Sequence, residues 1–226
     1  HTIMIDSCVG NHKHRPARPF WHMMHSDQYE RNLAAAGFGV GDIDYVMCTH
    51  LHGDHVGWNT RLDNGRWVPT FPKAKYVFAD RELEFWSQKE KEDPSKFPWM
   101  TDSVLPIVAA KRHEIVKSDH ALNDLVKLLP TPGHTIDHFS VQVGKPGQDA
   151  VITGDMIHSP IQARYPELVH FVDYDPQEGV RSRRKVFERV CDTSTLMCMA
   201  HFASPSAGLI ERAGEGFRYL PLSEGP

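Results

Sequence analysis

The sequence predicts an α/β protein whose strands fall into two groups with helices on the outside. Short apolar runs bounded by turn residues are typical of buried strands, and they occur in both halves of the chain, at 45–48, 75–79, 150–153 and 196–200. Helix start signals stand between such runs. The clearest is Asp175-Pro176-Gln177-Glu178, where Asp fits the N-cap, Pro the first helical position and Glu the third.

Composition indicates a soluble globular chain and argues against two classes of partner. The chain has 226 residues, enough for a sizeable buried core, although length alone does not choose between one large domain and two small ones. Its net charge of −4 and its lack of a basic block argue against nucleic acid. Its apolar runs are far shorter than the roughly 18 residues that span a bilayer. We therefore expect neither a nucleic-acid nor a membrane partner.

The four cysteines predict free thiols. Cys8, Cys48, Cys191 and Cys198 are widely spaced and form no C-x-x-C pair. Cys48 and Cys198 fall in predicted core strands, where a thiol behaves as a small apolar side chain. Unpaired cysteines fit a reducing compartment, so the expected location is cytoplasmic.

The N-terminal third combines one strand, an irregular segment and a helix. Residues 1–6 form a strand that runs into a turn, and the prolines of 11–25 argue against a helix there. That segment holds four histidines and the aromatic pair Phe20 and Trp21, so it is either a mobile wall of a ligand pocket or a surface loop anchored by the aromatic pair. A helix is predicted over 26–36, with Ser26 as N-cap and a closing glycine after it.

The middle of the chain predicts a hairpin, a helix and an insertion. Asn64-Gly65 is a hairpin turn within 58–72. Asp80 is expected to cap a helix that carries Leu83, Phe85 and Trp86, and the charged stretch 88–96 is expected to be solvated surface. The proline-containing stretch 94–113 is either part of a helical lid or a packing insertion.

The C-terminal half adds strands and one long helix. Strands are expected in 115–129 around a turn at 119–123, in 139–143, and at the end of the chain at 217–220, with a turn at 205–208. Neither Asp119 nor His120 in the first turn is expected to be catalytic. The helix after Asp175 should turn Val180, Phe187 and Val190 inward and its basic residues largely toward water. Those basic residues are Arg181, Arg183, Arg184 and Lys185.

Three histidines and an aspartate crowd into six residues directly after the strand at 45–48. They are His50, His52, Asp54 and His55. Two histidines spaced two apart at a strand end can project to the same side. Neutral imidazole and carboxylate are good zinc ligands, and a catalytic zinc keeps one coordination position open for water. A polar, solvated loop explains such a dense set of ligand-type side chains poorly, so we predict a metal site.

Together with three later motifs, this pattern resembles the metallo-β-lactamase-fold hydrolases, whose signature is H-x-H-x-D-H. A T-P-G-H-T sequence places His134, the strand 151–153 precedes Asp155, and the strand 196–200 precedes His201. The four motifs occur in the family's order and span residues 50 to 201. The resemblance implies an αββα metallo-β-lactamase sandwich formed by residues 1–226 as a single domain. In that family the strand at 1–6 follows another, so this chain is expected to lack the N-terminal strand or strands of the fold. The resulting unpaired edge makes a homodimer an option.

The resemblance also implies the ligands of two divalent ions. His50, His52 and His134 are assigned to the first ion, Asp54, His55 and His201 to the second, and Asp155 bridges. Two such ions would share a hydroxide that attacks an electrophilic centre. Zinc suits the nitrogen and oxygen ligands, and iron, manganese and cobalt remain compatible with them. The closest branch is the lactonase and ester-hydrolase group, which predicts the opening of a lactone or ester in a small-molecule substrate.

Other residues near these motifs are expected to assist. Asp6 either orients a ligand histidine or belongs to a turn, and the backbone of Gly133 is expected to approach the metal closely. His138 is retained from the family's T-P-G-H-T-P-G-H pattern although Ile-Asp replaces the second Pro-Gly, and it is expected to support the site. In the resembled lactonases a hydrogen-bonding side chain near the position of His158 reaches the substrate carbonyl. Asp54 and His158 are therefore assigned to catalysis, although His158 packed beside the site is a close alternative.

Three alternatives remain open. An organophosphate hydrolase or a hydrolytic dehalogenase of haloaromatics would use the same metal centre, and the many aromatic residues are compatible with it. A non-catalytic metal-binding protein of the same fold is expected to have lost ligands, and all seven are present. A nuclease is disfavoured by the acidic net charge.

Overall fold

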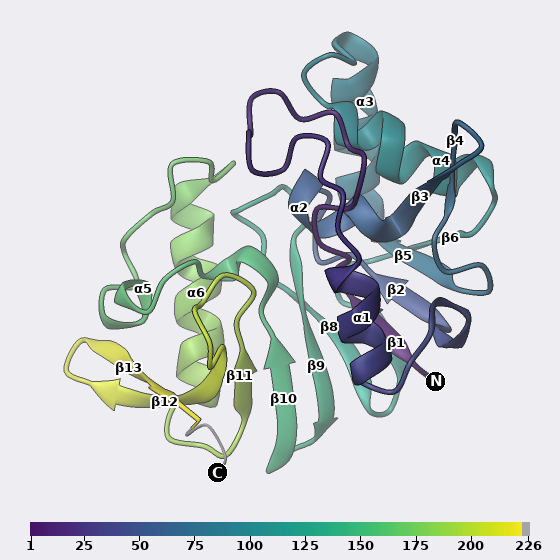
Figure 1. The fold of residues 1–226 in the computed structure, drawn as a ribbon. Coiled ribbons are helices and arrows are strands. Elements are labelled where there is room, and N and C mark those ends of the chain that lie inside the picture. The colour runs from purple at the N-terminus through teal and green to yellow at the C-terminus, as the bar shows by residue number, and fades with distance from the viewer. Residues whose placement is uncertain (223–226) are drawn as a thin grey trace. The chain divides into compact units, whose positions relative to one another are not determined.

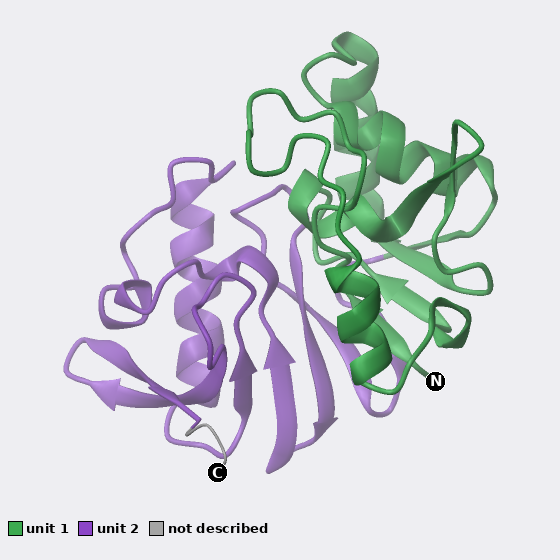
Figure 2. Cartoon of the chain, in the orientation of Figure 1, with its two compact units in different colours: residues 1–116 green, residues 117–226 purple. Residues whose placement is uncertain are grey.

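The computed structural model describes residues 1–222 and divides the chain into two compact units. Unit 1 comprises residues 1–116 and unit 2 the residues from 117 onward, shown in green and purple in Figure 2. Each unit contains its own sheet and its own hydrophobic core. The strands therefore fall into two groups, as the sequence predicts.

Unit 1 contains a four-stranded parallel sheet. Its order is β1 (Ile3–Ile5), β2 (Tyr45–Met47), β5 (Lys75–Ala79) and β6 (His113–Val116). Parallel strands need crossover connections, and these contain α1 (Gln28–Ala35), α2 (Gly53–Val56), α3 (Asp80–Glu92), α4 (Leu105–Ala109) and the hairpin of β3 (Thr60–Asp63) and β4 (Arg66–Pro69). Shorter helical turns lie at Val40–Asp42, Gly57–Asn59 and Met100–Val104. The metal motif follows β2 at the carboxyl edge of the sheet, where α/β sheets place ligand sites.

The proline-containing stretch 94–113 packs into the hydrophobic core of unit 1. Met100, Val104 and Ile107 are fully buried in the same cluster as Val46 and Phe78 from the sheet. Their burial supports the packing interpretation of 94–113, because these side chains are committed to the core.

Unit 2 contains a seven-stranded sheet that is antiparallel except for one central pair. Its order runs from β13 (Gly216–Pro221) through β12 (Ala207–Ala213), β11 (Leu196–Cys198), β10 (Gln148–Ile152), β9 (Phe139–Lys145) and β8 (Val126–Pro130) to β7 (Ala121–Asn123). Only β10 and β11 are parallel, and their crossover contains a short turn at Gly154–Met156, α5 (Ile161–Arg164) and α6 (Pro176–Val190). Asp155 and His201 follow this pair, so both leave the same edge of the sheet.

Helix α6 is the helix of unit 2 that the sequence predicts best. The side chain of Asp175 accepts a hydrogen bond from the backbone nitrogen of Glu178 at 3.0 Å, which makes Asp175 the expected N-cap. Val186, Phe187 and Val190 pack into the core with strand residues such as Met197. Figure 1 shows α6 lying along the sheet of this unit.

One prediction for α6 is wrong. Arg183 is not on the wet side, because its side chain is only 2% exposed. Its guanidinium donates to the carbonyl oxygens of Met156, Pro166 and Leu168 at 3.0, 2.6 and 2.9 Å. The arginine thus satisfies the carbonyls of an irregular segment that has no backbone partners for them, a role that helical periodicity cannot reveal.

Other predictions need smaller corrections. The helix expected over 26–36 begins at Gln28, and Ala79 rather than Asp80 stands at the N-cap of α3. Helix α3 continues through Glu92, so part of the stretch expected to be solvated surface is helical, and none of the residues 88–96 is buried. Residues 121–123 form β7 instead of part of a turn, and Ala207 and Gly208 already belong to β12. The hairpin at Asn64-Gly65 is confirmed, with φ angles of 48° and 75° at these two residues.

All four cysteines are free, as expected. Among residues 1–222, none of the helices has the length and apolar character that crossing a membrane requires.

Candidate metal centre

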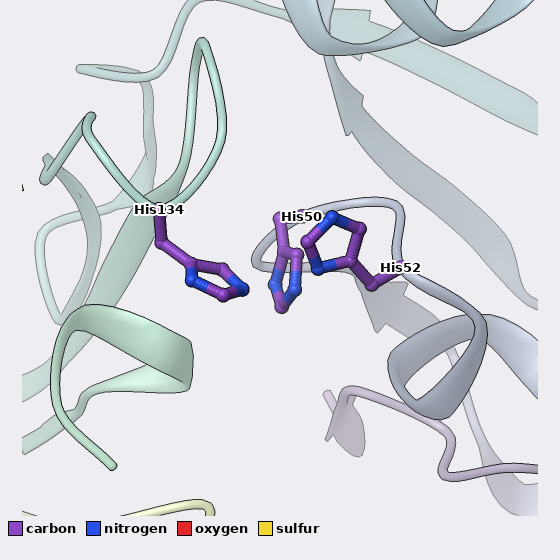
Figure 3. Close-up of side chains that lie close together, drawn as sticks. All are labelled: His50, His52 and His134. Atoms are coloured by element: carbon purple, nitrogen blue, oxygen red, sulfur yellow. The ribbon is translucent and has the colours of Figure 1, made fainter. Parts of the chain in front are cut away.

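The linear motif forms a compact cluster in unit 1, which we call the unit-1 cluster: His50, His52, Asp54 and His55. The ring centroids of His50 and His52 lie 4.6 Å apart at 81°, and those of His50 and His55 lie 4.1 Å apart. Figure 3 shows the first two side chains on the turn that follows β2. The turn packs tightly, since a Cβ at Gly57 would lie 1.8 Å from the carbonyl oxygen of Val9. A glycine is therefore required at the end of this motif.

Asp6 orients the unit-1 cluster from the end of β1. One of its oxygens lies 2.8 Å from Nδ1 of His55, and the two oxygens also accept hydrogen bonds from the backbone nitrogen and the hydroxyl of Thr49. A carboxylate at Nδ1 favours the tautomer whose lone pair is at Nε2, which is the arrangement found around metal-ligating histidines. Of the two roles considered for Asp6, the geometry supports the orienting one.

Glu82 is a supporting residue that the sequence did not reveal. Its side chain is buried, and Oε1 accepts hydrogen bonds from the backbone nitrogen of Leu51 at 3.1 Å and from Nε1 of Trp86 at 2.6 Å. It therefore fixes the backbone between His50 and His52. The sequence carries no signal for this role, because a glutamate in the first turn of a helix is ordinary.

Segment 11–25 is held to unit 1 by charge rather than by its aromatic pair. The Lys13 side chain is fully buried and donates to the hydroxyl of Thr60 at 2.7 Å and to the carbonyl oxygen of Asp102 at 3.1 Å. Arg15 makes two hydrogen bonds to the Asp102 carboxylate at 2.7 and 2.8 Å. Phe20, by contrast, is 92% exposed, so the expectation that it anchors the segment is wrong.

The second group of ligand-type residues converges on one carboxylate in unit 2. We call it the unit-2 cluster: His134, Asp155, His158 and His201. Asp155 is buried, and its oxygens lie 3.3 Å from Nε2 of His134, 3.1 Å from Nε2 of His158 and 3.0 Å from Nε2 of His201. Two ligands at about 2.1 Å from one ion are themselves about 3.0–3.4 Å apart. These spacings fit metal coordination.

His134 is fixed by a carboxylate that the sequence analysis missed. Nδ1 of His134 lies 2.9 Å from Oδ1 of Asp173. The other oxygen of Asp173 accepts a hydrogen bond from the backbone nitrogen of His170 at 2.8 Å. Burial alone would lower the pKa of His134, but the carboxylates of Asp155 and Asp173 raise it above its ordinary value. Asp173 lies 39 residues from His134 in the sequence, so only the fold reveals the pair.

The loop before His134 packs against a helix. Gly133 has a φ of +133°, and a Cβ there would lie 2.1 Å from the backbone nitrogen of Gly179 in α6. The close approach that Gly133 permits is therefore one to the first turn of α6. In Figure 3 the side chain of His134 leaves this loop.

His138 supports the cluster through the backbone. Its Nε2 accepts the backbone N–H of Asp155 at 2.9 Å, and its Nδ1 lies 2.8 Å from the hydroxyl of Thr131. Both ring nitrogens are thus occupied by protein groups. This arrangement agrees with the expected supporting role and not with that of a ligand.

His158 lies beside Asp155, and its ring stacks with two other imidazoles. Its ring is parallel to that of His170 within 9° at a centroid distance of 4.1 Å, and to that of His201 within 14° at 5.2 Å. An ion bound by a histidine lies in the plane of the ring, so two parallel stacked rings cannot share one ion. His158 is therefore better placed as a hydrogen-bonding neighbour of the cluster than as a ligand together with His170.

The donor set of both clusters suits a divalent metal. Imidazole nitrogens and carboxylate oxygens dominate, and the Nδ1 atoms of His55 and His134 each face a carboxylate. Within unit 2, ligand atoms of Asp155, His158 and His201 all lie within 4.8 Å of one another. The predicted site residues thus form two clusters, one in each unit.

Comparison with known proteins shows similarity to one superfamily over most of the chain. The family model described as Metallo-beta-lactamase superfamily matches residues 1–201. An N-acyl homoserine lactonase of Bacillus thuringiensis is 23% identical over 180 residues, covering 79% of this chain and 64% of that protein. This chain thus spans less than two thirds of the length of the curated lactonases it matches. The uncharacterized protein YobT of Bacillus subtilis (strain 168) is 28% identical over 158 residues, covering 65% of this chain and 63% of that protein.

Solved structures show the same fold. AidC, described as a dizinc quorum-quenching lactonase in complex with the product N-hexnoyl-L-homoserine, superposes with a TM-score of 0.80 at 20% identity. The hydrolase AbOPH, described as in the beta lactamase superfamily, gives 0.81 at 26% identity. Each comparison covers 99% of this chain and 76% of the other. The predicted fold class is confirmed.

Proposed function

Because this chain belongs to the metallo-beta-lactamase superfamily, we propose that its two clusters together bind two divalent ions and that the protein hydrolyses a lactone or an ester. His50, His52 and His134 would hold the first ion, Asp54, His55 and His201 would hold the second, and Asp155 is proposed as a ligand of both. The convergence of three imidazole Nε2 atoms on the buried Asp155 carboxylate carries this proposal. Zinc is the preferred metal, since it favours nitrogen and oxygen ligands of this kind.

When bound, the ions would supply Lewis acidity and a nucleophile at neutral pH. The residues of the chain keep the ligands ready for that role. Asp6 and Asp173 hold the Nδ1 sides of His55 and His134, which leaves the Nε2 lone pairs for coordination. Glu82 and His138 fix the backbone at Leu51 and Asp155, so the ligands need little rearrangement.

His158 is proposed to assist the reacting carbonyl. Its Nε2 lies 3.1 Å from Oδ2 of Asp155, so the ring is adjacent to the site. An N–H group aimed at the carbonyl oxygen would stabilise the negative charge that develops when the carbonyl is attacked. Asp54 is proposed to contribute to catalysis as the ligand that places the second ion.

Several relatives support a lactone as substrate. The matched curated proteins from Bacillus thuringiensis are named N-acyl homoserine lactonases. AidC is described with N-hexnoyl-L-homoserine, and a mutant of the B. thuringiensis protein AiiA with N-decanoyl-L-homoserine bound at the active site. A small-molecule ester or lactone is therefore the substrate class we propose.

The direct test is a substrate panel on metal-loaded protein. The panel contains an acyl-homoserine lactone, an aryl ester, a phosphotriester, a chlorinated aromatic nitrile and a β-lactam, and the readout is the initial rate. Preferential turnover of the lactone or the ester is expected. Selective turnover of the phosphotriester or the chloroaromatic would replace this proposal by the organophosphate or dehalogenase alternative.

A further inference from the structure

Segment 11–25 brings two histidines together from opposite ends of one loop. In Figure 1 this segment is the dark purple loop between β1 and α1. Nε2 of His12 and Nδ1 of His25 lie 3.2 Å apart, and the two ring centroids lie 4.9 Å apart at 44°. The two residues are 13 positions apart in the sequence, which matches none of the usual spacings of zinc ligands. Only the fold therefore reveals this pair.

The backbone of the loop keeps the two rings close together. Nδ2 of Asn11 donates to the carbonyl oxygen of Ser26 at 2.7 Å, and the backbone nitrogen of Ser26 donates to Oδ1 of Asn11 at 3.2 Å. The backbone nitrogen of His12 donates to the carbonyl oxygen of Met24 at 2.8 Å. His12 has a φ of +59°, a conformation that is uncommon for residues with a side chain. The loop closure thus holds both imidazoles at the same end of the loop.

A second histidine pair in the same loop differs from the first. The ring centroids of His14 and His22 lie 5.0 Å apart at 71°. Nδ1 of His22 accepts a hydrogen bond from the backbone nitrogen of Arg15 at 3.0 Å. The proton of the neutral His22 ring is then on Nε2, so neither ring nitrogen has a lone pair left for an ion. His14 and His22 are therefore a matched control for the first pair.

The spacing of the His12 and His25 nitrogens fits a shared ion. Two ligands at about 2.1 Å from one ion are about 3.0–3.4 Å apart, and the observed 3.2 Å lies in this range. The same distance is at the long end for a hydrogen bond between two neutral rings, which is the alternative. Imidazole favours ions such as Zn²⁺, Ni²⁺ and Cu²⁺ over Mg²⁺ and Ca²⁺. Because His25 is exposed, water can occupy the remaining positions around such an ion.

We propose that His12 and His25 bind one further, exchangeable zinc ion that cross-links the two ends of segment 11–25. Two protein ligands hold an ion less tightly than the four of a structural zinc site, so desalting removes it. The segment also carries Arg15, whose Nε lies 3.7 Å from the position that a Cβ at Gly53 would occupy. An ion at this pair therefore stabilises a segment that packs against the metal motif. The inference does not depend on the proposed hydrolysis.

The first test titrates Zn²⁺ by calorimetry into protein that has been loaded with zinc and then desalted. The wild type should bind one further equivalent. His12→Ala and His25→Ala should each weaken this step by about tenfold or more, because each removes one of two ligands, whereas His14→Ala should leave it unchanged. His25→Gln separates the ion from the hydrogen bond, since a glutamine amide can still bond to His12 but is a poor zinc ligand. It should lose the further zinc as His25→Ala does, and circular dichroism verifies that each variant is folded.

Limited proteolysis tests whether the ion cross-links the loop. Phe20 is 92% exposed within the segment and offers a cleavage site to chymotrypsin. Zn²⁺ should slow cleavage there severalfold in the wild type and leave the rate of His12→Ala unchanged. A wild type that binds no further zinc would overturn the site, as would undiminished binding by His25→Ala or an equal loss in His14→Ala. An unchanged cleavage rate in the zinc-bound wild type would overturn the cross-link.

Discussion

The unit-1 and unit-2 clusters are assembled from the chain in different ways. In unit 1, four ligand-type side chains come from six consecutive residues, 50–55, on one turn after a parallel strand. In unit 2, His134, Asp155 and His201 come from the ends of three different strands and meet at one carboxylate. The first cluster is therefore organised by local backbone geometry, and the second depends on the register of a sheet and on a single central residue.

The largest effect should follow removal of that central residue. Asp155→Ala takes away the carboxylate that three imidazoles approach, so bound metal and hydrolysis should both fall to background. Metal analysis and initial rates on the same sample measure this. Asp119→Ala is the control, since Asp119 is exposed in the same unit and should leave both unchanged. Metal content near wild type in Asp155→Ala would contradict the assignment.

Next in size is the effect of His158→Ala. Losing one hydrogen-bond donor to a developing oxyanion costs about 10²–10³ in kcat, while the ligands themselves remain. We expect turnover to fall by this order with metal content close to wild type. If the rate were unchanged, His158 would be a packed neighbour, the alternative that the sequence left open.

The carboxylates behind the two clusters should differ in importance. Removing a carboxylate that holds a ligand histidine typically costs 10–100-fold in metal affinity. Asp6→Asn should cost more than Asp173→Asn, because Asp6 also holds the backbone and hydroxyl of Thr49. Competition with a chromophoric chelator gives both affinities. A larger loss for Asp173→Asn would show that the unit-2 cluster is the less tolerant of the two.

A smaller effect on stability is expected from Arg183. Arg183→Met leaves the carbonyls of Met156 and Pro166 without their side-chain donor and that of Leu168 with Gln162 alone, at a cost of about 1–3 kcal/mol for each carbonyl left unpaired if no water replaces the arginine. Arg184→Met is the neighbouring control, because Arg184 forms a surface ion pair with Glu167 that should contribute about 0–1 kcal/mol. Urea unfolding compares the two. Equal losses of unfolding free energy in the two variants would mean that the buried hydrogen bonds of Arg183 contribute no more than the surface ion pair of Arg184.

The last effect is on the pH dependence of stability and comes from the buried amine of Lys13 in unit 1. Burial, opposed by the charge of Asp102, lowers the pKa of Lys13 from 10.5 to about 7. Between about pH 7 and 10.5 the unfolded chain therefore binds a proton that the folded chain does not, so Lys13 makes stability rise with pH across this window. The free energy of unfolding of the wild type, minus that of Lys13→Met, should increase from pH 7 to 9.5. A difference in unfolding free energy that stays constant with pH would contradict the lowered pKa of Lys13.

The difference between the clusters also explains what could be predicted from sequence. The group of ligand-type residues at 50–55 could be predicted because the strand, the turn and these side chains are consecutive in the sequence. The hairpin at Asn64-Gly65 could be predicted for the same local reason. His134, Asp155 and His201 could be predicted only through the resemblance, since nothing local shows that they meet. The sequence did not predict the roles of Asp173, Glu82 and the buried Arg183, because polar residues in loops and helices are usually solvated. Only tertiary packing makes these three residues exceptions.

The central claim is that both clusters serve one metal-dependent hydrolytic centre. It is tested most directly by titrating zinc into metal-free protein while recording bound metal and lactone hydrolysis in the same sample. Activity should be absent without metal and should reach its plateau at two equivalents per chain. Full hydrolysis by the metal-free protein, or a plateau that the binding of the second ion does not affect, would contradict the account.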